Sequence, residues 1–372
     1  MLMEVFSIVL GVCIILLVIT DIVLTVLHIQ GRSLIEWLFT RSLWSLLRAI
    51  ASPLPGRSKH HVLSWGFPLM IAGLIGIWVC LLVVGYSLIY WPFISNDAYF
   101  SQTQYHQGFG GALYFSGVTL ATIGYGDIHP RSTLLGFVAV TEGFSGFVVI
   151  TMSVTFLLSV YPSLLKKSSL ASALNREVDG DISAVPMIAR YIDAGNLEAL
   201  YTRIADINKD LLEVIEAYRV HSALYYAHPF EPDRSLVRVL LIIRGIITAL
   251  RFGLYDQSRK VGQPWNDPRI LVLEDSFTYA LAMFAESVYV ASRQSEYSEK
   301  EVREYLRKDY RSLRHRLHDL GLVLSADDGA EEEYVRFRLS VDPYINAYRE
   351  HSGYTTSEVE SKLELAAHPL KK

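Results

Sequence analysis

Three apolar runs in the sequence are long enough to cross a lipid bilayer as helices. They cover residues 5–28, 67–91 and 133–161, and a crossing needs about 20 apolar residues. Only helices and closed barrels satisfy every backbone hydrogen bond inside a bilayer. The runs therefore predict membrane-spanning helices. The first run is too long for a signal peptide, follows an acid rather than basic residues and precedes no small-residue cleavage site, so we expect it to be retained.

The composition supports a membrane protein. Of the 372 residues, 51% are hydrophobic and only 19% are charged, which is too apolar for an ordinary soluble protein. A net charge of -4 gives no indication of a nucleic-acid partner. Cys13 and Cys80 lie within apolar runs, where cysteine behaves as a small hydrophobic residue rather than part of a disulfide or metal framework. We expect an all-α membrane protein without a cofactor.

Basic residues predict the orientation. Between the first two runs, five of them accompany the single acid Glu36: Arg32, Arg41, Arg48, Arg57 and Lys59. The third run is followed by Lys166 and Lys167. The positive-inside rule places both segments in the cytoplasm. The N-terminus and residues 92–132 then lie on the extracellular side of the cell membrane, and the C-terminal part is cytoplasmic.

The basic linker has two further features. Some of its large apolar residues suit a helix in the membrane interface, although an ordinary connector fits equally well; they are Leu34, Trp37, Leu38, Trp44 and Leu47. His60 and His61 follow in a basic stretch, where they either report pH or are simply solvated.

Prolines mark the expected ends of the spans. Pro68 fits the first turn of the second helix, and Pro92 follows its end. Pro162 is expected to end the third helix, because proline lacks the backbone N–H that an interior helical position requires.

After Lys167 the sequence predicts a helical cytoplasmic domain. Asn196 is typical of a helix N-cap, and two pairs have capping-box spacing: Ser298 with Glu301, before a helix ending at Gly321, and Thr355 with Glu358. Residues 235–256 are very apolar but contain arginines, which indicates a buried or oligomer-forming helix rather than a fourth span. We expect three parts: residues 1–64, with the first span and linker; 65–166, a pore domain; and 167–372, the cytoplasmic domain.

Between the second and third spans, the chain interrupts its apolar character with glycines and an acid. The stretch GFGGALYFSGVTLA ends at Ala121 and can form a short helix that points into the membrane. Its carbonyl end would carry partial negative charge, which favours a cation. Irregular backbone at this depth is tolerated only when protein buries it or it lines a water-filled path. The interruption therefore predicts an ion site.

The next residues, TIGYGD, suit cation coordination by backbone carbonyls. Gly124 and Gly126 can adopt left-handed conformations without a Cβ penalty. Thr122 adds a hydroxyl oxygen, and we expect the side chains of Ile123 and Tyr125 to point outward into the surrounding protein. Asp127 follows at the extracellular end of this segment. Its carboxylate either hydrogen-bonds behind the coordinating backbone or attracts cations.

The stretch TLATIGYGD resembles the potassium-channel signature Thr-x-x-Thr-x-Gly-Tyr-Gly-Asp. The matching residues are Thr119, Thr122, Gly124, Tyr125, Gly126 and Asp127. The resemblance covers residues 67–165 and implies a homotetramer around one axis. It implies that K⁺ binds at Thr122, Ile123, Gly124 and Tyr125, with Gly126 completing the filter.

The resemblance also implies supporting roles for residues outside the filter. Tyr114 and Phe115 stand where many family members have two tryptophans that pack around the filter, and the Tyr114 hydroxyl is expected to reach Asp127. Val118 replaces a glutamate that some members bury behind the filter. Glu142, in the third span, is expected to brace the pore helix or filter from behind, although a position facing a water-filled cavity is a second possibility.

On the third span, Gly146 falls near the hinge glycine of similar channels, and Gly143 is a second candidate. Packing against the pore helix explains Gly146 equally well. By the same alignment Ile150, Val154 and Leu158 face the central cavity, where an apolar lining can close by dewetting.

The function expected from the sequence is a potassium-selective channel, not an enzyme. The first span has no series of arginines, so steep voltage gating is not expected. The C-terminal domain either regulates opening, with an unidentified cytoplasmic ligand, or holds the tetramer together. An acidic cluster near residue 330 lacks EF-hand spacing. The alternatives are a non-selective cation channel and a membrane-anchored signalling or adaptor protein with a vestigial pore.

Overall fold

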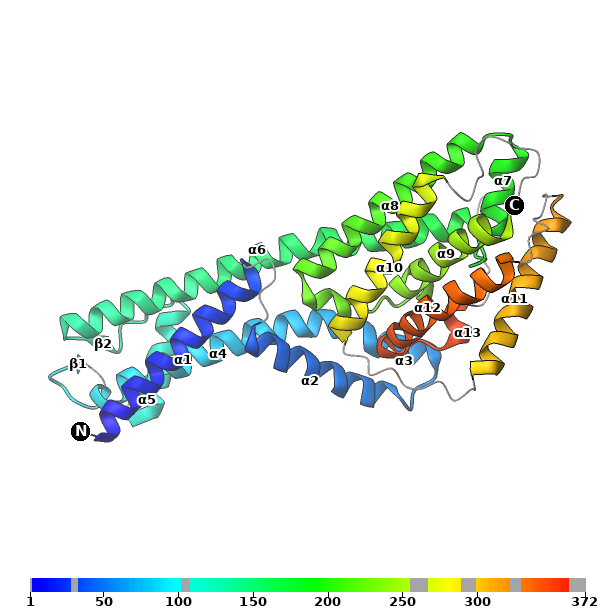
Figure 1. Ribbon diagram of the computed structural model, residues 1–372. Helices are drawn as coiled ribbons and strands as arrows, with labels where there is room; N and C mark the ends of the chain where they lie inside the picture. Colours follow the sequence, from blue (N-terminus) through cyan, green and yellow to red (C-terminus); the bar gives the residue numbers. More distant parts are fainter. Residues whose placement is uncertain are drawn as a thin grey trace, which may run out of the picture. The chain divides into compact units, whose positions relative to one another are not determined.

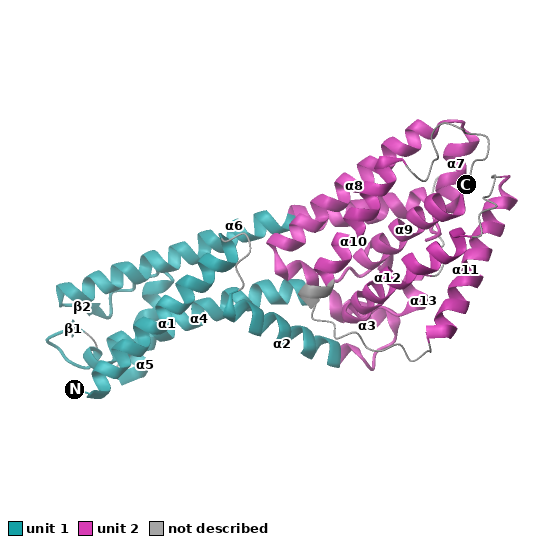
Figure 2. Ribbon diagram, in the orientation of Figure 1, with its two compact units in different colours: residues 1–49, 65–161 teal, residues 50–64, 162–372 magenta. Residues whose placement is uncertain are grey.

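The computed structural model describes residues 2–27, 33–101, 108–254, 267–288, 299–321 and 329–360, and these are mostly helical (Figure 1). A short antiparallel pair joins β1 (Phe100–Ser101) to β2 (His129–Pro130). The chain divides into two compact units (Figure 2). Unit 1 comprises residues 1–49 and 65–161, and unit 2 comprises residues 50–64 and 162–372. The sequence predicts a division into three parts by function. That division stays a prediction, because units defined by compactness do not test it.

Unit 1 contains the apolar helices. These are α1 (Leu2–Val26), α2 (Leu34–Ala51), α4 (Gly66–Ile94), α5 (Gly108–Leu120) and the first part of α6 (Thr133–Glu177). Within the described part of the chain, three helical stretches are long and apolar enough to cross a membrane: residues 2–26, 56–94 and 133–177. They contain the second and third runs found in the sequence and all but the last two residues of the first. The expected all-α membrane fold is confirmed.

The helices α1 and α4 pack closely through two glycines, a packing that the sequence left open. A Cβ on Gly11 would lie 2.4 Å from the Gly85 carbonyl oxygen, and a Cβ on Gly85 would lie 2.9 Å from the Ile15 side chain. The Ser7 hydroxyl donates a hydrogen bond to the Leu88 carbonyl across the same contact, at 3.1 Å. Small residues that allow close backbone approach are typical of helix pairs in membranes.

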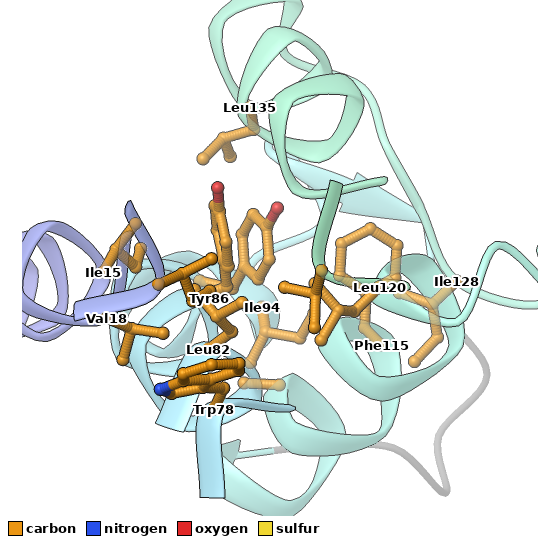
Figure 3. Packing of buried hydrophobic residues seen from close by; sticks show 14 of the residues in the cluster. Ile15, Val18, Trp78, Leu82, Tyr86, Ile94, Phe115, Leu120, Ile128 and Leu135 are labelled. Carbon is orange, nitrogen blue, oxygen red and sulfur yellow. The ribbon is translucent and has the colours of Figure 1, made fainter. Parts of the chain in front are cut away.

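The core of unit 1 joins α1, α4, α5 and α6 (Figure 3). Ile15 and Val18 from α1 meet Trp78 and other α4 side chains, while α5 contributes Phe115 and Leu120. Further buried members are Ile22, Leu74, Leu82, Tyr86, Tyr90, Ile94, Phe100, Ala112, Ile128, Leu135 and Val149. The short helix α5 is thus anchored in the same core as the helices on either side of it.

The expectation that Pro162 ends the third helix is wrong. The helix α6 continues through Pro162 to Glu177. An interior proline removes one backbone hydrogen bond and costs about 3 kcal/mol, and burial of Leu170, Ala171 and Leu174 on the continuing helix offsets this cost. Pro92 also lies inside its helix, two residues before α4 ends at Ile94. Pro68 lies in the first turn of α4, as expected.

Unit 2 is a helical bundle. It contains α3 (Gly56–Ser64), the end of α6, α7 (Val185–Asp193), α8 (Leu197–Val220), η1 (Ser222–Tyr226), η2 (Pro232–Arg234), α9 (Leu236–Thr248), η3 (Ala249–Gly253), α10 (Pro268–Val288), α11 (Glu299–Asp319), α12 (Gly329–Ser352) and α13 (Thr356–Glu360). Every residue of α9 is buried. This confirms that the arginine-containing segment is a core helix.

Two arginines within α9 are paired. Arg238 donates to the Asn175 side chain at 2.8 Å and to the Val359 carbonyl at 2.5 Å. Arg244 pairs with Asp342 at 3.0 Å. Burying a charge is tolerated only when it is hydrogen-bonded, so these contacts allow the arginines to lie in the core.

Two predicted helix caps are present. The Asn196 side chain accepts a hydrogen bond from the Ala199 N–H at 3.1 Å. Thr355 and Glu358 form the reciprocal capping box before α13, because the Thr355 N–H donates to Glu358 at 2.7 Å. Ser298 lies outside the described residues.

The linker helix α2 has a buried and an exposed side. Trp44 and Leu47 are buried, whereas Leu34, Trp37 and Leu38 are exposed. Whether this exposed side lies in the membrane interface stays a prediction.

The N-terminus of α2 is held by Asp21 of α1. Its carboxylate accepts from the Ile35 N–H and from the Trp78 indole, each at 2.9 Å. Both contacts lie within unit 1, so this intramembrane acid is hydrogen-bonded to α2 through Ile35 and to α4 through Trp78.

Candidate functional site

The TIGYG segment has an unusual backbone. Positive φ angles recur at every second residue, with 55° at Thr122, 60° at Gly124 and 79° at Gly126. A left-handed conformation costs an L-residue about 1–2 kcal/mol, whereas glycine adopts it freely. Glycine therefore avoids this conformational cost at residues 124 and 126, whereas the backbone of Thr122 stays strained. Strain of this kind is common at functional sites. The residue sequence alone did not predict it at Thr122.

The segment continues directly from the carbonyl end of α5. Beyond the last helical residue, the N–H of Thr122 bonds the Thr119 carbonyl and that of Ile123 bonds the Val118 carbonyl, each at 2.9 Å. The side chains of Ile123 and Tyr125 are 54% and 69% exposed in the single chain. The outward packing expected for them stays a prediction, because it needs neighbouring subunits.

Two aromatic residues of α5, Tyr114 and Phe115, make contacts close to this segment. The Tyr114 hydroxyl donates to the Asp127 carboxylate at 2.9 Å, which is the bond expected from the sequence. Phe115 packs edge-on against Tyr90 and Phe100, with ring centroids 5.0 and 5.3 Å away. Since Phe100 belongs to β1, the strand pair and α5 share one aromatic cluster.

Glu142 joins three helices. Its side chain is completely buried, accepts a hydrogen bond from Tyr90 of α4 at 2.8 Å, and is in short contact with the Ser116 hydroxyl of α5. The Ser116 hydroxyl also lies 3.0 Å from the Val83 carbonyl. The contacts agree with a brace behind α5 and not with a solvated position. Sequence reasoning missed Tyr90 and Ser116, because neither lies near Glu142 along the chain.

Replacing Glu142 with alanine is expected to destabilise this region. The buried Tyr90 hydroxyl would lose its partner, which costs about 1–3 kcal/mol, and the missing side chain would leave a cavity. Thermal unfolding of the detergent-solubilised protein should show a melting temperature several degrees lower.

The matched control for this prediction is Glu142→Gln. A glutamine keeps the volume, can accept from Tyr90, and can donate to the Ser116 oxygen. We expect it to melt close to the wild type. An alanine variant as stable as the wild type would contradict the brace.

The two candidate hinge glycines have different surroundings. A Cβ on Gly146 would lie 2.0 Å from the Leu120 carbonyl oxygen, at the end of α5. A Cβ on Gly143 would meet only the Thr119 carbonyl oxygen, at 3.7 Å. Gly146 therefore allows α6 to approach α5 closely. This favours close packing over a hinge as the reason for a glycine at this position.

The three residues expected to line a cavity share one side of α6. Ile150, Val154 and Leu158 are spaced by four residues and are 61%, 51% and 71% exposed in the single chain. Residues three or four apart lie on the same helix face. Their role as a cavity lining stays a prediction.

The donors that could hold an ion here are main-chain oxygens and the Thr122 hydroxyl. Among the residues that the structure describes, no group of three or more His, Cys, Asp or Glu side chains is arranged to hold a metal ion. Carbonyl coordination suits a cation such as K⁺, which needs oxygens in place of its hydration shell.

Comparison with known proteins supports an ion-channel pore in this part of the chain. Residues 74–161 match the ion channel family. The chain is also similar to the uncharacterized membrane protein YdjJ of Bacillus subtilis (strain 168), with 25% identity over 230 residues. This match covers 61% of the chain and 62% of the relative, which is less than two thirds of its length. No solved structure shows significant similarity.

Proposed function

We propose that this chain forms a potassium-selective channel that conducts K⁺ passively through a homotetrameric pore. The observation that carries the proposal is the alternation of positive φ angles along TIGYG, at Thr122, Gly124 and Gly126. An alternating backbone of this kind lets consecutive carbonyls turn to the same side. Four such segments around an axis would supply the oxygens that replace the hydration shell of K⁺.

The position of the segment supports the same function. It follows the carbonyl end of α5, whose partial negative charge favours a cation. The ion channel match covers residues 74–161, from within α4 to within α6. K⁺ would bind at Thr122, Ile123, Gly124 and Tyr125, with Gly126 at the outer end of the filter. Asp127 is already engaged by Tyr114, which favours a supporting role over direct cation attraction.

A homotetramer would also explain the exposed side of α6. Ile150, Val154 and Leu158 would face the central cavity. Ile123 and Tyr125 would pack against neighbouring subunits, since each subunit contributes one filter segment. We further propose that unit 2 is cytoplasmic, as the basic residues of the linker and of positions 166–167 indicate, and that it modulates opening.

The reversal potential of the purified protein in a lipid bilayer tests this function. With K⁺ on one side and Na⁺ on the other, we expect current to reverse close to the potassium equilibrium potential. Reversal near zero would instead indicate a non-selective cation channel. Absence of current at varied pH, calcium and voltage would favour a signalling or adaptor protein with a vestigial pore.

A further inference from the structure

The helix α2 presents positive charge and large apolar side chains on the same exposed side. Arg41 and Arg48 are both exposed, and seven residues of helix make about two turns, so the two arginines share a face. The guanidinium of Arg41 lies over the Trp37 ring, 5.5 Å from its centre. The large apolar residues exposed on α2 include Leu34, Trp37, Leu38 and Leu46.

The charge on this side is positive throughout. Glu36, the acid of α2, is buried on the other side of the helix. The hydroxyls of Ser42 and Ser45 are exposed but donate to carbonyls one turn earlier, those of Leu38 and Arg41, at 2.7 and 2.9 Å. The two guanidinium groups are therefore the strong hydrogen-bond donors that this side offers to a ligand.

The buried side of α2 holds the helix closely against α4. A Cβ on Gly73 would lie 2.4 Å from the Phe39 ring, and a Cβ on Gly66 would lie 3.0 Å from the Trp44 ring. Both rings thus occupy space that a glycine leaves open. Together with the hydrogen bond from the start of α2 to Asp21, these contacts fix the position of the exposed side within unit 1.

The contact with α4 places α2 at one end of a membrane span. Gly66 is the first residue of α4, and Gly73 lies within the second apolar run. Seven helical residues cover about 10 Å, which matches the depth of about 5–10 Å to which an interfacial helix enters the boundary between headgroups and acyl chains. Trp65, directly before α4, is exposed as well, and tryptophan is enriched at membrane interfaces.

We propose that the exposed side of α2 is a docking surface for anionic phospholipid. Its leucines and Trp37 enter the acyl-chain region, and Arg41 binds the phosphate of a lipid beside Trp37. A guanidinium forms paired hydrogen bonds with phosphate oxygens. Arg48 adds to the positive potential two turns further along. The positive-inside rule assigns this surface to the cytoplasmic leaflet; that assignment rests on the orientation proposed above, whereas the lipid contact does not.

Charge decides which lipid this surface prefers. Phosphatidylcholine also has a phosphate, but its choline group cancels the negative charge. An anionic lipid keeps that charge, and each arginine near an anionic surface strengthens the attraction by about fivefold. A neighbouring copy of the chain is a less suitable occupant, because cations buried within a membrane need acidic partners, which the second copy would have to supply. The membrane supplies phosphate groups at this depth.

Quenching of tryptophan fluorescence by brominated lipids tests the proposal, because bromine quenches a tryptophan only on close approach. The full-length protein is reconstituted into phosphatidylcholine liposomes that contain increasing fractions of brominated phosphatidylglycerol or brominated phosphatidylcholine. The difference between the wild type and Trp37→Phe isolates the signal of Trp37. We expect the brominated anionic lipid to quench Trp37 at about fivefold lower mole fraction than the brominated phosphatidylcholine.

Two arginine variants locate the preference. Arg41→Gln should reduce the fivefold difference between the two lipids to nearly none, while Trp37 stays open to quenching by both. Each variant is compared with its own fluorescence in unbrominated lipid, so loss of the contact between Arg41 and Trp37 does not alter the ratio. Arg57→Gln is the control: it removes one positive charge from the same linker, but its guanidinium lies over the Phe230 ring, 5.7 Å away, and the preference should remain.

Three results would overturn the docking surface. If neither lipid quenched Trp37, protein such as a neighbouring subunit would cover this side of α2. Equal quenching by the two lipids in the wild type would show that the surface does not select charge. An equal loss of preference in Arg57→Gln and Arg41→Gln would assign the effect to the net charge of the linker. The measurement involves no ion flow, so its outcome is independent of the proposed channel function.

Discussion

Replacing Gly146 with alanine is expected to abolish conduction and to lower the melting temperature. The new Cβ would lie 2.0 Å from the Leu120 carbonyl oxygen and 3.0 Å from the Leu120 carbonyl carbon. Both atoms are backbone, so no side chain can rotate away. Either α6 must move away or the end of α5 must shift, and TIGYG, the proposed filter, follows one residue after α5. A displacement there would disturb the coordination geometry proposed for K⁺.

Gly143→Ala is the matched control on the same helix. Its Cβ would meet its nearest neighbour, the Thr119 carbonyl oxygen, at 3.7 Å, an ordinary contact. Alanine is favoured over glycine within a helix by about 1 kcal/mol. We therefore expect Gly143→Ala to be as stable as the wild type or slightly more stable, and Gly146→Ala to be less stable despite the same gain in helix propensity.

The comparison also separates packing from bending. If Gly146 served only as a hinge, alanine would stiffen α6 without loss of stability and would alter opening alone. Thermal unfolding and potassium flux into liposomes, measured on both variants, distinguish the two. A Gly146→Ala protein with wild-type stability would show that the close approach is not required.

The membrane helices were predictable, and TIGYG could be recognised as a candidate site, because both signals are local. An apolar run of sufficient length predicts a span, and TIGYG lies in one continuous stretch of chain. The same local reasoning failed at Pro162. Proline is unfavourable inside a helix wherever it occurs, but the sequence does not show that Leu170 and Leu174 bury the continuing helix in unit 2. Tertiary packing outweighed the local preference there.

The partners of Glu142 and His60 could not be predicted because they are distant in sequence. The carboxylate of Glu142 bonds Tyr90, 52 positions away, and His60 bonds Glu358, 298 positions away. Glu142 was recognised as an unusual intramembrane acid, but nothing local identified Tyr90 or Ser116 as its partners. His60 and His61 are adjacent in the sequence and chemically identical. They differ in the structure, where His60 is buried and His61 is exposed.

Replacing Gly124 with alanine is expected to remove potassium-selective conduction while leaving the rest of the fold intact. Gly124 has a φ of 60°, and a residue with a Cβ pays about 1–2 kcal/mol for this left-handed conformation. No neighbouring atom lies within 4 Å of the added Cβ in the single chain, so backbone conformation and not local crowding carries the cost there. In the proposed tetramer the cost arises four times around one axis.

The strained segment is then expected to relax into a right-handed or extended conformation at residue 124. That change would turn a carbonyl away from the side shared by its neighbours and remove coordinating oxygens from the pore. Potassium flux in liposomes should fall to background, or the reversal potential should move toward zero if a less selective path remains. Thermal unfolding of unit 2 should not change.

Gly117→Ala provides the control for an added methyl group near the filter. Gly117 lies within α5, and a Cβ there also meets no atom within 4 Å. Alanine suits a helical position, so this variant should conduct with the wild-type reversal potential. If Gly124→Ala conducted as selectively as Gly117→Ala, the alternating backbone would not be what coordinates the ion, and the selectivity would have to come from side-chain oxygens such as the Thr122 hydroxyl.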